Sequence, residues 1–116
     1  MSSELQELQS ALRKFAAARD WKQFHTPKNL AASISIEAAE LLEHFQWLTN
    51  EQSAELPPEQ RTEVGHEIAD VLIYLLQLSD SLGIDPIDAA WRKLEINAEK
   101  YPADRARRSA RKYTEL

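Results

Sequence analysis

The scarcity of glycine constrains this sequence more than any other feature. Only two of its 116 residues are glycines, Gly65 and Gly83, and β-branched residues are few, whereas Ala, Leu, Glu, Gln and Lys are abundant. Because the residues of this second group are strong helix formers, the composition favours helices along nearly the whole chain. Two glycines are also too few for a glycine-rich phosphate loop or a dinucleotide-binding fingerprint. Any phosphate chemistry must therefore use side chains and a metal ion rather than backbone amides.

Hydrophobic periodicity and helix boundary signals predict a single all-helical domain. Thr26 can cap one helix that has Pro27 in its first position, and Gly83 is suited to end another. Residues 1–104 are expected to form the domain, and residues 105–116 a basic C-terminal tail. Four helices are predicted, at about residues 3–19, 27–50, 59–82 and 86–101.

Several classes of protein are excluded by what the sequence lacks. It has no cysteine, which rules out disulfides, thiolate metal sites and cysteine nucleophiles. Its apolar runs are too short to span a bilayer, and its polar N-terminus has no hydrophobic signal-peptide region. We therefore expect a cytoplasmic protein with neither a membrane nor a nucleic acid polymer as partner.

Acidic residues are concentrated in one part of the chain. The formal net charge is −5, yet residues 37–70 contain nine acidic residues and one base, Arg61, which is −8 within that window. The rest of the sequence therefore carries +3, so the acidity belongs to two predicted helices and their connection.

Four of these carboxylates occupy equivalent places on two helices. At about 100° per residue, Glu37 and Glu40 lie at one edge of the apolar face of their helix, and Glu67 and Asp70 at the same edge of theirs. If the two helices pack antiparallel, the four carboxylates meet at one rim of the core and repel each other. A hard divalent cation, Mg²⁺ or Mn²⁺, would relieve that repulsion and take phosphate oxygens as further ligands. The alternative interpretation is an ordinary solvated acidic face.

The fourth predicted helix carries polar side chains that suit a phosphate ligand. Lys93 and Asn97 flank its apolar face, and Lys100 and Tyr101 follow. A cation and an amide beside a metal cluster are what phosphoryl oxygens and a sugar or base edge require. In isolation, such residues are most often simply solvated.

Three segments together resemble the MazG-like all-α nucleoside triphosphate pyrophosphohydrolases. They are SIEAAEL at residues 35–41, EIADVLIYL at 67–75 and KLEINAEKYP at 93–102. A narrower likeness, to the dCTP pyrophosphatase branch, is carried by residues 19–25, 45–47 and 109–116. The resemblance covers nearly the whole chain.

This resemblance implies a fold and an activity. The fold is all-α with a four-helix-bundle core, assembled as a homo-oligomer that is either a dimer or a tetramer. The activity is Mg²⁺-dependent hydrolysis of a deoxynucleoside triphosphate to the monophosphate and pyrophosphate, with Mn²⁺ as a second candidate ion. The leading substrate is dCTP or a modified dCTP, which would make the protein an enzyme of nucleotide-pool sanitation. The alternative is a nucleotide-binding regulatory or structural helical module without turnover.

The resemblance also implies site residues. Glu37, Glu40, Glu67 and Asp70 would be metal ligands and catalytic groups, and either Glu37 or Glu40 would orient or deprotonate the attacking water. Leu12 stands where the close branch has a further base-pocket histidine, which leaves the preferred base open. The substrate would be contacted by Lys93 and Asn97 at phosphate and sugar, by Tyr74 and Tyr101 in the site walls, and by Trp21, His25 and Trp47 around the base.

Overall fold

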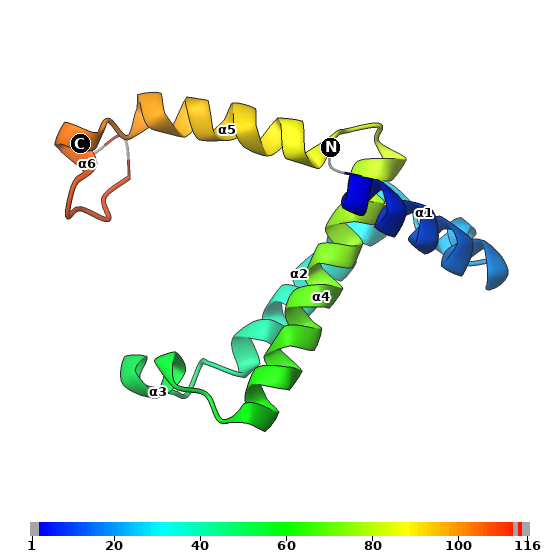
Figure 1. Ribbon diagram of the computed structural model, residues 1–116, viewed down its shortest axis with the longest axis horizontal. Helices are drawn as coiled ribbons and strands as arrows, with labels where there is room; N and C mark the ends of the chain where they lie inside the picture. The colour runs from blue at the N-terminus through cyan, green and yellow to red at the C-terminus, as the bar shows by residue number, and fades with distance from the viewer. Residues whose placement is uncertain (1–2, 113, 115–116) are drawn as a thin grey trace.

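The computed structural model describes residues 3–112 and residue 114. Within these residues the chain forms helices and turns but no strand (Figure 1), which confirms the predicted all-helical class. In chain order the elements are α1 (Ser3–Ala18), the 3-10 helix η1 (Lys22–Phe24), α2 (Pro27–Glu43), α3 (Asn50–Ala54), α4 (Pro58–Ser81), α5 (Pro86–Lys100) and α6 (Ala103–Ala106).

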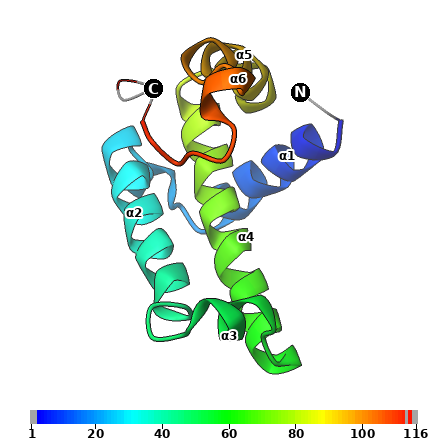
Figure 2. The same cartoon turned by 90° about the vertical axis from the view of Figure 1, so that its left-hand side faces the viewer.

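The antiparallel pair of α2 and α4 forms the centre of the molecule (Figures 1 and 2). As predicted, Thr26 caps α2, its Oγ1 accepting a hydrogen bond of 3.2 Å from the amide of Asn29. The most buried apolar side chains of the pair are Leu30 and Leu76, exposed by 1% and 2%, followed by Val64. Burial of these side chains holds the two helices together.

The helix α2 ends at Glu43 rather than near residue 50, so its predicted length is wrong. Residues 44–48 form turns, after which a capping box starts α3. In it, Thr49 Oγ1 accepts from the amide of Gln52 at 3.1 Å, and Gln52 Oε1 accepts from the amide of Thr49 at 3.0 Å. This reciprocal pair defines a helix start, so the chain begins a new helix where a continued one was expected.

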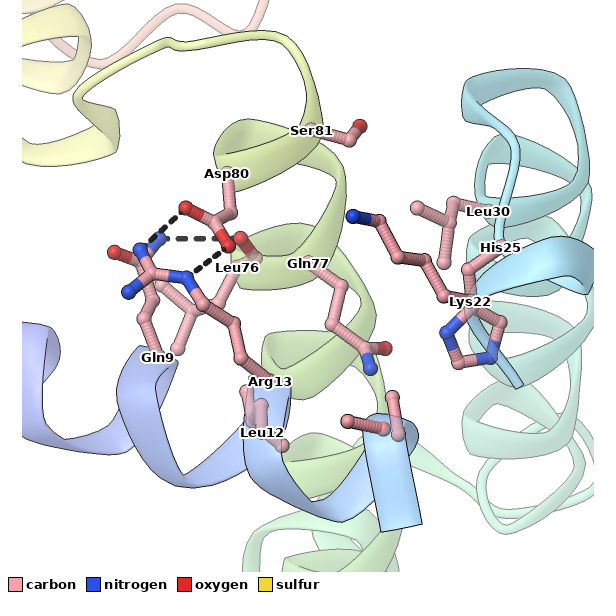
Figure 3. A pocket seen from close by; sticks show the side chains of 12 residues that line it. Gln9, Leu12, Arg13, Lys22, His25, Leu30, Leu76, Gln77, Asp80 and Ser81 are labelled. Atoms are coloured by element: carbon pink, nitrogen blue, oxygen red, sulfur yellow. Dashed lines mark hydrogen bonds and ion pairs between the residues drawn. The ribbon is translucent and has the colours of Figure 1, made fainter. Parts of the chain in front are cut away.

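Polar contacts attach α1 to the C-terminal part of α4. Gln9, which is buried, donates from Nε2 to the carbonyl oxygen of Leu76 at 3.1 Å. One turn further along α1, the Arg13 guanidinium forms a two-pronged ion pair with the Asp80 carboxylate, at 2.7 and 2.6 Å. Figure 3 shows this pair at the edge of a cavity between the two helices. The pairing keeps the pKa of Asp80 below its ordinary value.

The helix α5 projects away from the α2 and α4 pair instead of packing on it (Figure 1). Its start is as predicted, because Asp85 accepts from the amides of Ile87 and Asp88. Its apolar face is uncovered, with Trp91 65% and Leu94 58% exposed. The radius of gyration is 17.5 Å, whereas a compact domain of this length has about 13 Å. The predicted four-helix core is therefore not closed within a single chain.

The predicted basic tail starts inside the short helix α6, while residues 113, 115 and 116 lie outside the described residues. The domain boundary at residue 104 stays a prediction. Over the described residues, none of the helices combines the length and hydrophobicity that crossing a bilayer requires.

Replacing Asp80 by Asn is expected to weaken the attachment of α1. Because the folded pKa of Asp80 is lowered, its stabilisation is fully present above the ordinary value of 3.8 and is lost as pH falls through the folded value. Urea unfolding should show Asp80→Asn less stable than the parent at pH 7, with a difference that shrinks at acidic pH below 3.8. The exposed α1 substitution Glu7→Gln is the control and should leave the midpoint unchanged. Equal stability of parent and Asp80→Asn at pH 7 would contradict this role.

Candidate active site

Three carboxylates from α2 and α4 converge where the two helices face each other. One oxygen from each of Glu37, Glu67 and Asp70 lies within 4.8 Å of the other two. Glu67 and Asp70 are three residues apart on α4 and share one side of it, and Glu37 comes from α2. We call these three residues the carboxylate cluster. The predicted pairing of the two helices thus brings together three of the four predicted metal ligands, and the fourth, Glu40, lies beside Glu37 and interacts with it.

Two oxygens of the carboxylate cluster are buried without compensation. In the described part of the chain, Oε2 of Glu37 and Oε2 of Glu67 have neither solvent nor a hydrogen-bond donor. Burying a charged oxygen without a partner is costly. Burial is the main cause that raises the pKa of Glu37 to about 7, and the carboxylates of Glu40, Asp70 and Glu67 add to it. A carboxyl group perturbed by burial and by like charges is typical of functional sites.

A divalent cation fits the carboxylate cluster. It would supply the positive charge that the buried oxygens lack, and all available donors are oxygens, the ligands that Mg²⁺ and Mn²⁺ prefer. On α4, Tyr74 follows Asp70 by one helical turn, so a predicted wall residue stands next to the cluster. The arrangement can therefore hold a metal ion together with an anionic ligand.

Two of the predicted base contacts lie together near the start of α2. The rings of Trp21 and His25 meet edge to face at a centroid distance of 6.2 Å, and Phe15 of α1 packs in the same manner against Trp21 at 5.7 Å. His25 lines a cavity of about 560 Å³ between α1, η1, α2 and α4, a size typical of small-molecule sites. We call it the α1–α4 cavity (Figure 3).

Other polar residues of the α1–α4 cavity escaped the sequence analysis. Arg13, Lys22 and Gln77 line it together with His25. They come from α1, η1 and α4, and no spacing pattern links segments so far apart in the chain. The signals that pointed to this cavity were His25 and Leu12, which the resemblance placed at the base pocket and which both line it, and the buried Leu30 and Leu76.

Three predicted substrate contacts lie far from the carboxylate cluster in a single chain, and a fourth, Trp47, lies far from His25. Trp47 is 86% exposed and follows α2, so the whole 17-residue helix, about 26 Å long, separates it from His25. Lys93 and Asn97 lie on α5 and Tyr101 at its end, and α5 points away from α2 and α4 (Figure 1). One chain alone does not bring the residues of α5 to the carboxylates.

Comparison with known proteins gives consistent results. Residues 32–116 match the MazG-like family. The chain is 42% identical to dCTP pyrophosphatase 1 of Homo sapiens and 39% identical to that of Mus musculus, in both cases over 114 residues, which are 97% of this chain and 67% of the relative. Among solved structures it resembles a pyrophosphatase from Archaeoglobus fulgidus DSM 4304, with a TM-score of 0.82 and 51% identity, covering 88% of this chain and 95% of that one.

Binding of Mg²⁺ to the carboxylate cluster is expected to weaken as pH falls from 8 to 6. Because the pKa of Glu37 is about 7, the ion must displace a proton at the lower pH. Calorimetric titration in two buffers of different ionisation enthalpy should detect roughly half a proton released per ion at pH 7. Glu37→Gln should bind more weakly and release none. Binding that is independent of pH and releases no proton from the parent would contradict the assignment.

The raised pKa of Glu37 also determines how the stability of the metal-free protein changes with pH. A carboxyl whose folded pKa is raised contributes stability that is full below its ordinary value of 4.5 and lost as pH rises through about 7. The unfolding midpoint without metal should therefore decline over this range, and Glu37→Gln should decline less.

Proposed function

Because this chain belongs to the MazG-like family and is a nucleoside triphosphate pyrophosphohydrolase, we propose that it cleaves dCTP or a modified dCTP to the monophosphate and pyrophosphate with Mg²⁺ as cofactor. Its role would be nucleotide-pool sanitation in the cytoplasm. The observation that carries the proposal is the carboxylate cluster, with its two buried oxygens that lack donors. The relatives named dCTP pyrophosphatase 1 support the choice of base.

The side chains have distinct tasks in this reaction. Glu37, Glu67 and Asp70 would hold the ion, with Glu40 as the fourth ligand, and Mn²⁺ could replace Mg²⁺. When bound, the ion would neutralise phosphate charge and polarise a phosphoryl oxygen. Glu37 and Glu40 are the two carboxylates on α2 that can accept the proton of the attacking water. No covalent nucleophile is needed, because in-line attack by water suffices.

A second copy of the chain completes the site in this proposal. The helices α4 and α5 leave apolar side chains uncovered, including Ile68 at 54% and Leu75 at 43% on α4 and Trp91 at 65% on α5. Contiguous uncovered apolar surface marks an interaction site. In a dimer, or in a tetramer built from two dimers, α5 of one copy packs on α4 of the other and closes the four-helix core. Lys93 and Asn97 of one copy then reach the carboxylates of the other.

The direct test of the activity is pyrophosphate release from a panel of deoxynucleoside triphosphates. The parent protein should cleave dCTP or a modified dCTP in the presence of Mg²⁺, and chelation of the metal should abolish turnover. Asp70→Asn should lower kcat/KM by roughly a hundredfold or more, because it removes a charged ligand. The exposed substitution Glu51→Gln should leave it unchanged. Nucleotide binding that stabilises the protein without any cleavage would instead identify a regulatory module.

The shared site is tested by co-expressing two inactive variants. Glu67→Gln damages the carboxylate cluster, and Lys93→Ala removes the cation on α5. A mixed dimer of these variants has one site with both defects and one intact site, so co-expression should restore roughly a quarter of the parent activity. Glu67→Gln paired with Asp70→Asn damages the same half of every site and should restore none, which makes it the control. Failure of the first pair to recover would contradict a site built from two copies.

A further inference from the structure

The α1–α4 cavity and the carboxylate cluster lie along one face of the helix pair. Gln77 follows Asp70 by seven residues on α4, which turns it by only about 20° from Asp70 and moves it about 10 Å along the helix. On α2, Leu30 precedes Glu37 by the same seven residues. Since the helices run antiparallel, both offsets lead toward the α1–α4 cavity. A nucleotide with its phosphates at the carboxylates can span this distance through its sugar and place its base in the cavity.

Gln77 carries a buried polar atom in the α1–α4 cavity that has no hydrogen-bond partner among the described residues. Two glutamines line the cavity. The side-chain amide of Gln9 is engaged with the carbonyl of Leu76, whereas Oε1 of Gln77 is buried and accepts no hydrogen bond. A buried amide oxygen without a donor costs free energy that a suitable ligand would recover. Figure 3 shows the Gln77 side chain directed into the cavity, between Arg13 on one side and Lys22 and His25 on the other.

The polar groups around Gln77 define the chemistry of a matching ligand. Arg13 and Lys22 are donors only, and the nearby acceptor Asp80 is already paired with Arg13. Oε1 of Gln77 is therefore a side-chain acceptor at this place in the cavity that still lacks a donor. The cavity therefore suits a flat group with acceptors on its ring and an exocyclic amino group beside them.

We propose that Gln77 is a specificity-determining residue that reads the amino edge of the base, its Oε1 accepting from the exocyclic amino group and its Nε2 donating to the adjacent ring nitrogen. This inference rests on the proposed function, since it places the base of the same substrate in the α1–α4 cavity. The class it selects is an amino-bearing pyrimidine nucleotide. With the amide in this orientation, a uracil base places its carbonyl oxygen opposite Oε1 and its ring N–H opposite Nε2, so neither hydrogen bond forms unless the amide turns by 180°.

The test is the ratio of kcat/KM for dCTP to kcat/KM for dUTP in variants of Gln77. Gln77→Met keeps the size of the side chain and removes both hydrogen bonds, so kcat/KM for dCTP should fall roughly tenfold and the ratio should fall with it. Gln77→Glu keeps an acceptor and loses the donor, so it should retain more of the preference for dCTP than Gln77→Met does. The exposed α1 substitution Gln6→Met is the matched control and should change neither value.

A second measurement separates this inference from the proposed function. Affinity for the non-hydrolysable α,β-imido analogue of dCTP should fall in Gln77→Met, while Mg²⁺ binding and the unfolding midpoint stay within the range of the control. If the parent cleaves dCTP and Gln77→Met keeps both the ratio and the affinity, Gln77 does not read the base and the inference is wrong. If the parent cleaves no deoxynucleoside triphosphate, the proposed function itself fails.

Discussion

The mutual repulsion of carboxylates that α2 and α4 hold together is the constraint on which this site depends. Apolar burial around Leu30, Val64 and Leu76 keeps the helices paired, and that pairing brings Glu37, Glu67 and Asp70 within 4.8 Å. Two of their oxygens are buried without a donor. Such an arrangement is unfavourable in isolation and becomes favourable with a divalent cation. In the proposed function, a metal ion would neutralise part of the −8 of residues 37–70, which would allow an acidic chain to bind an anionic nucleotide.

A second constraint is the small core of a single chain. The radius of gyration of 17.5 Å and the exposure of Trp91 and Leu94 show that α5 has its apolar face free. The helix that carries the predicted phosphate contacts, Lys93 and Asn97, is the same helix that lacks a packing partner. Closure of the core and completion of the site are therefore one event in the proposed assembly. Activity would then depend on protein concentration as well as on metal.

Local signals in the sequence predicted local structure well. The sequence predicted the caps at Thr26 and Asp85 and the carboxylate spacing on α2 and α4. These features depend on residues only a few positions apart in the chain. The early end of α2 was missed, since the capping box of Thr49 lies within a run that continues the helical pattern. Trp47 and the α5 residues were assigned to one site by resemblance, and nothing in a single sequence states which copy of the chain supplies them. In the α1–α4 cavity, His25 was predicted by resemblance, whereas Arg13, Lys22 and Gln77 were missed because the cavity is built from four separate segments.

The central claim is that the carboxylate cluster is a metal site that faces the phosphates of a nucleotide. The most direct measurement is an anomalous difference map from crystals grown with Mn²⁺ and the non-hydrolysable α,β-imido analogue of dCTP. The claim predicts a manganese peak among the carboxylates of Glu37, Glu67 and Asp70, with analogue phosphate oxygens among its ligands. An occupied nucleotide with no peak at these residues, or with manganese bound elsewhere, would contradict it.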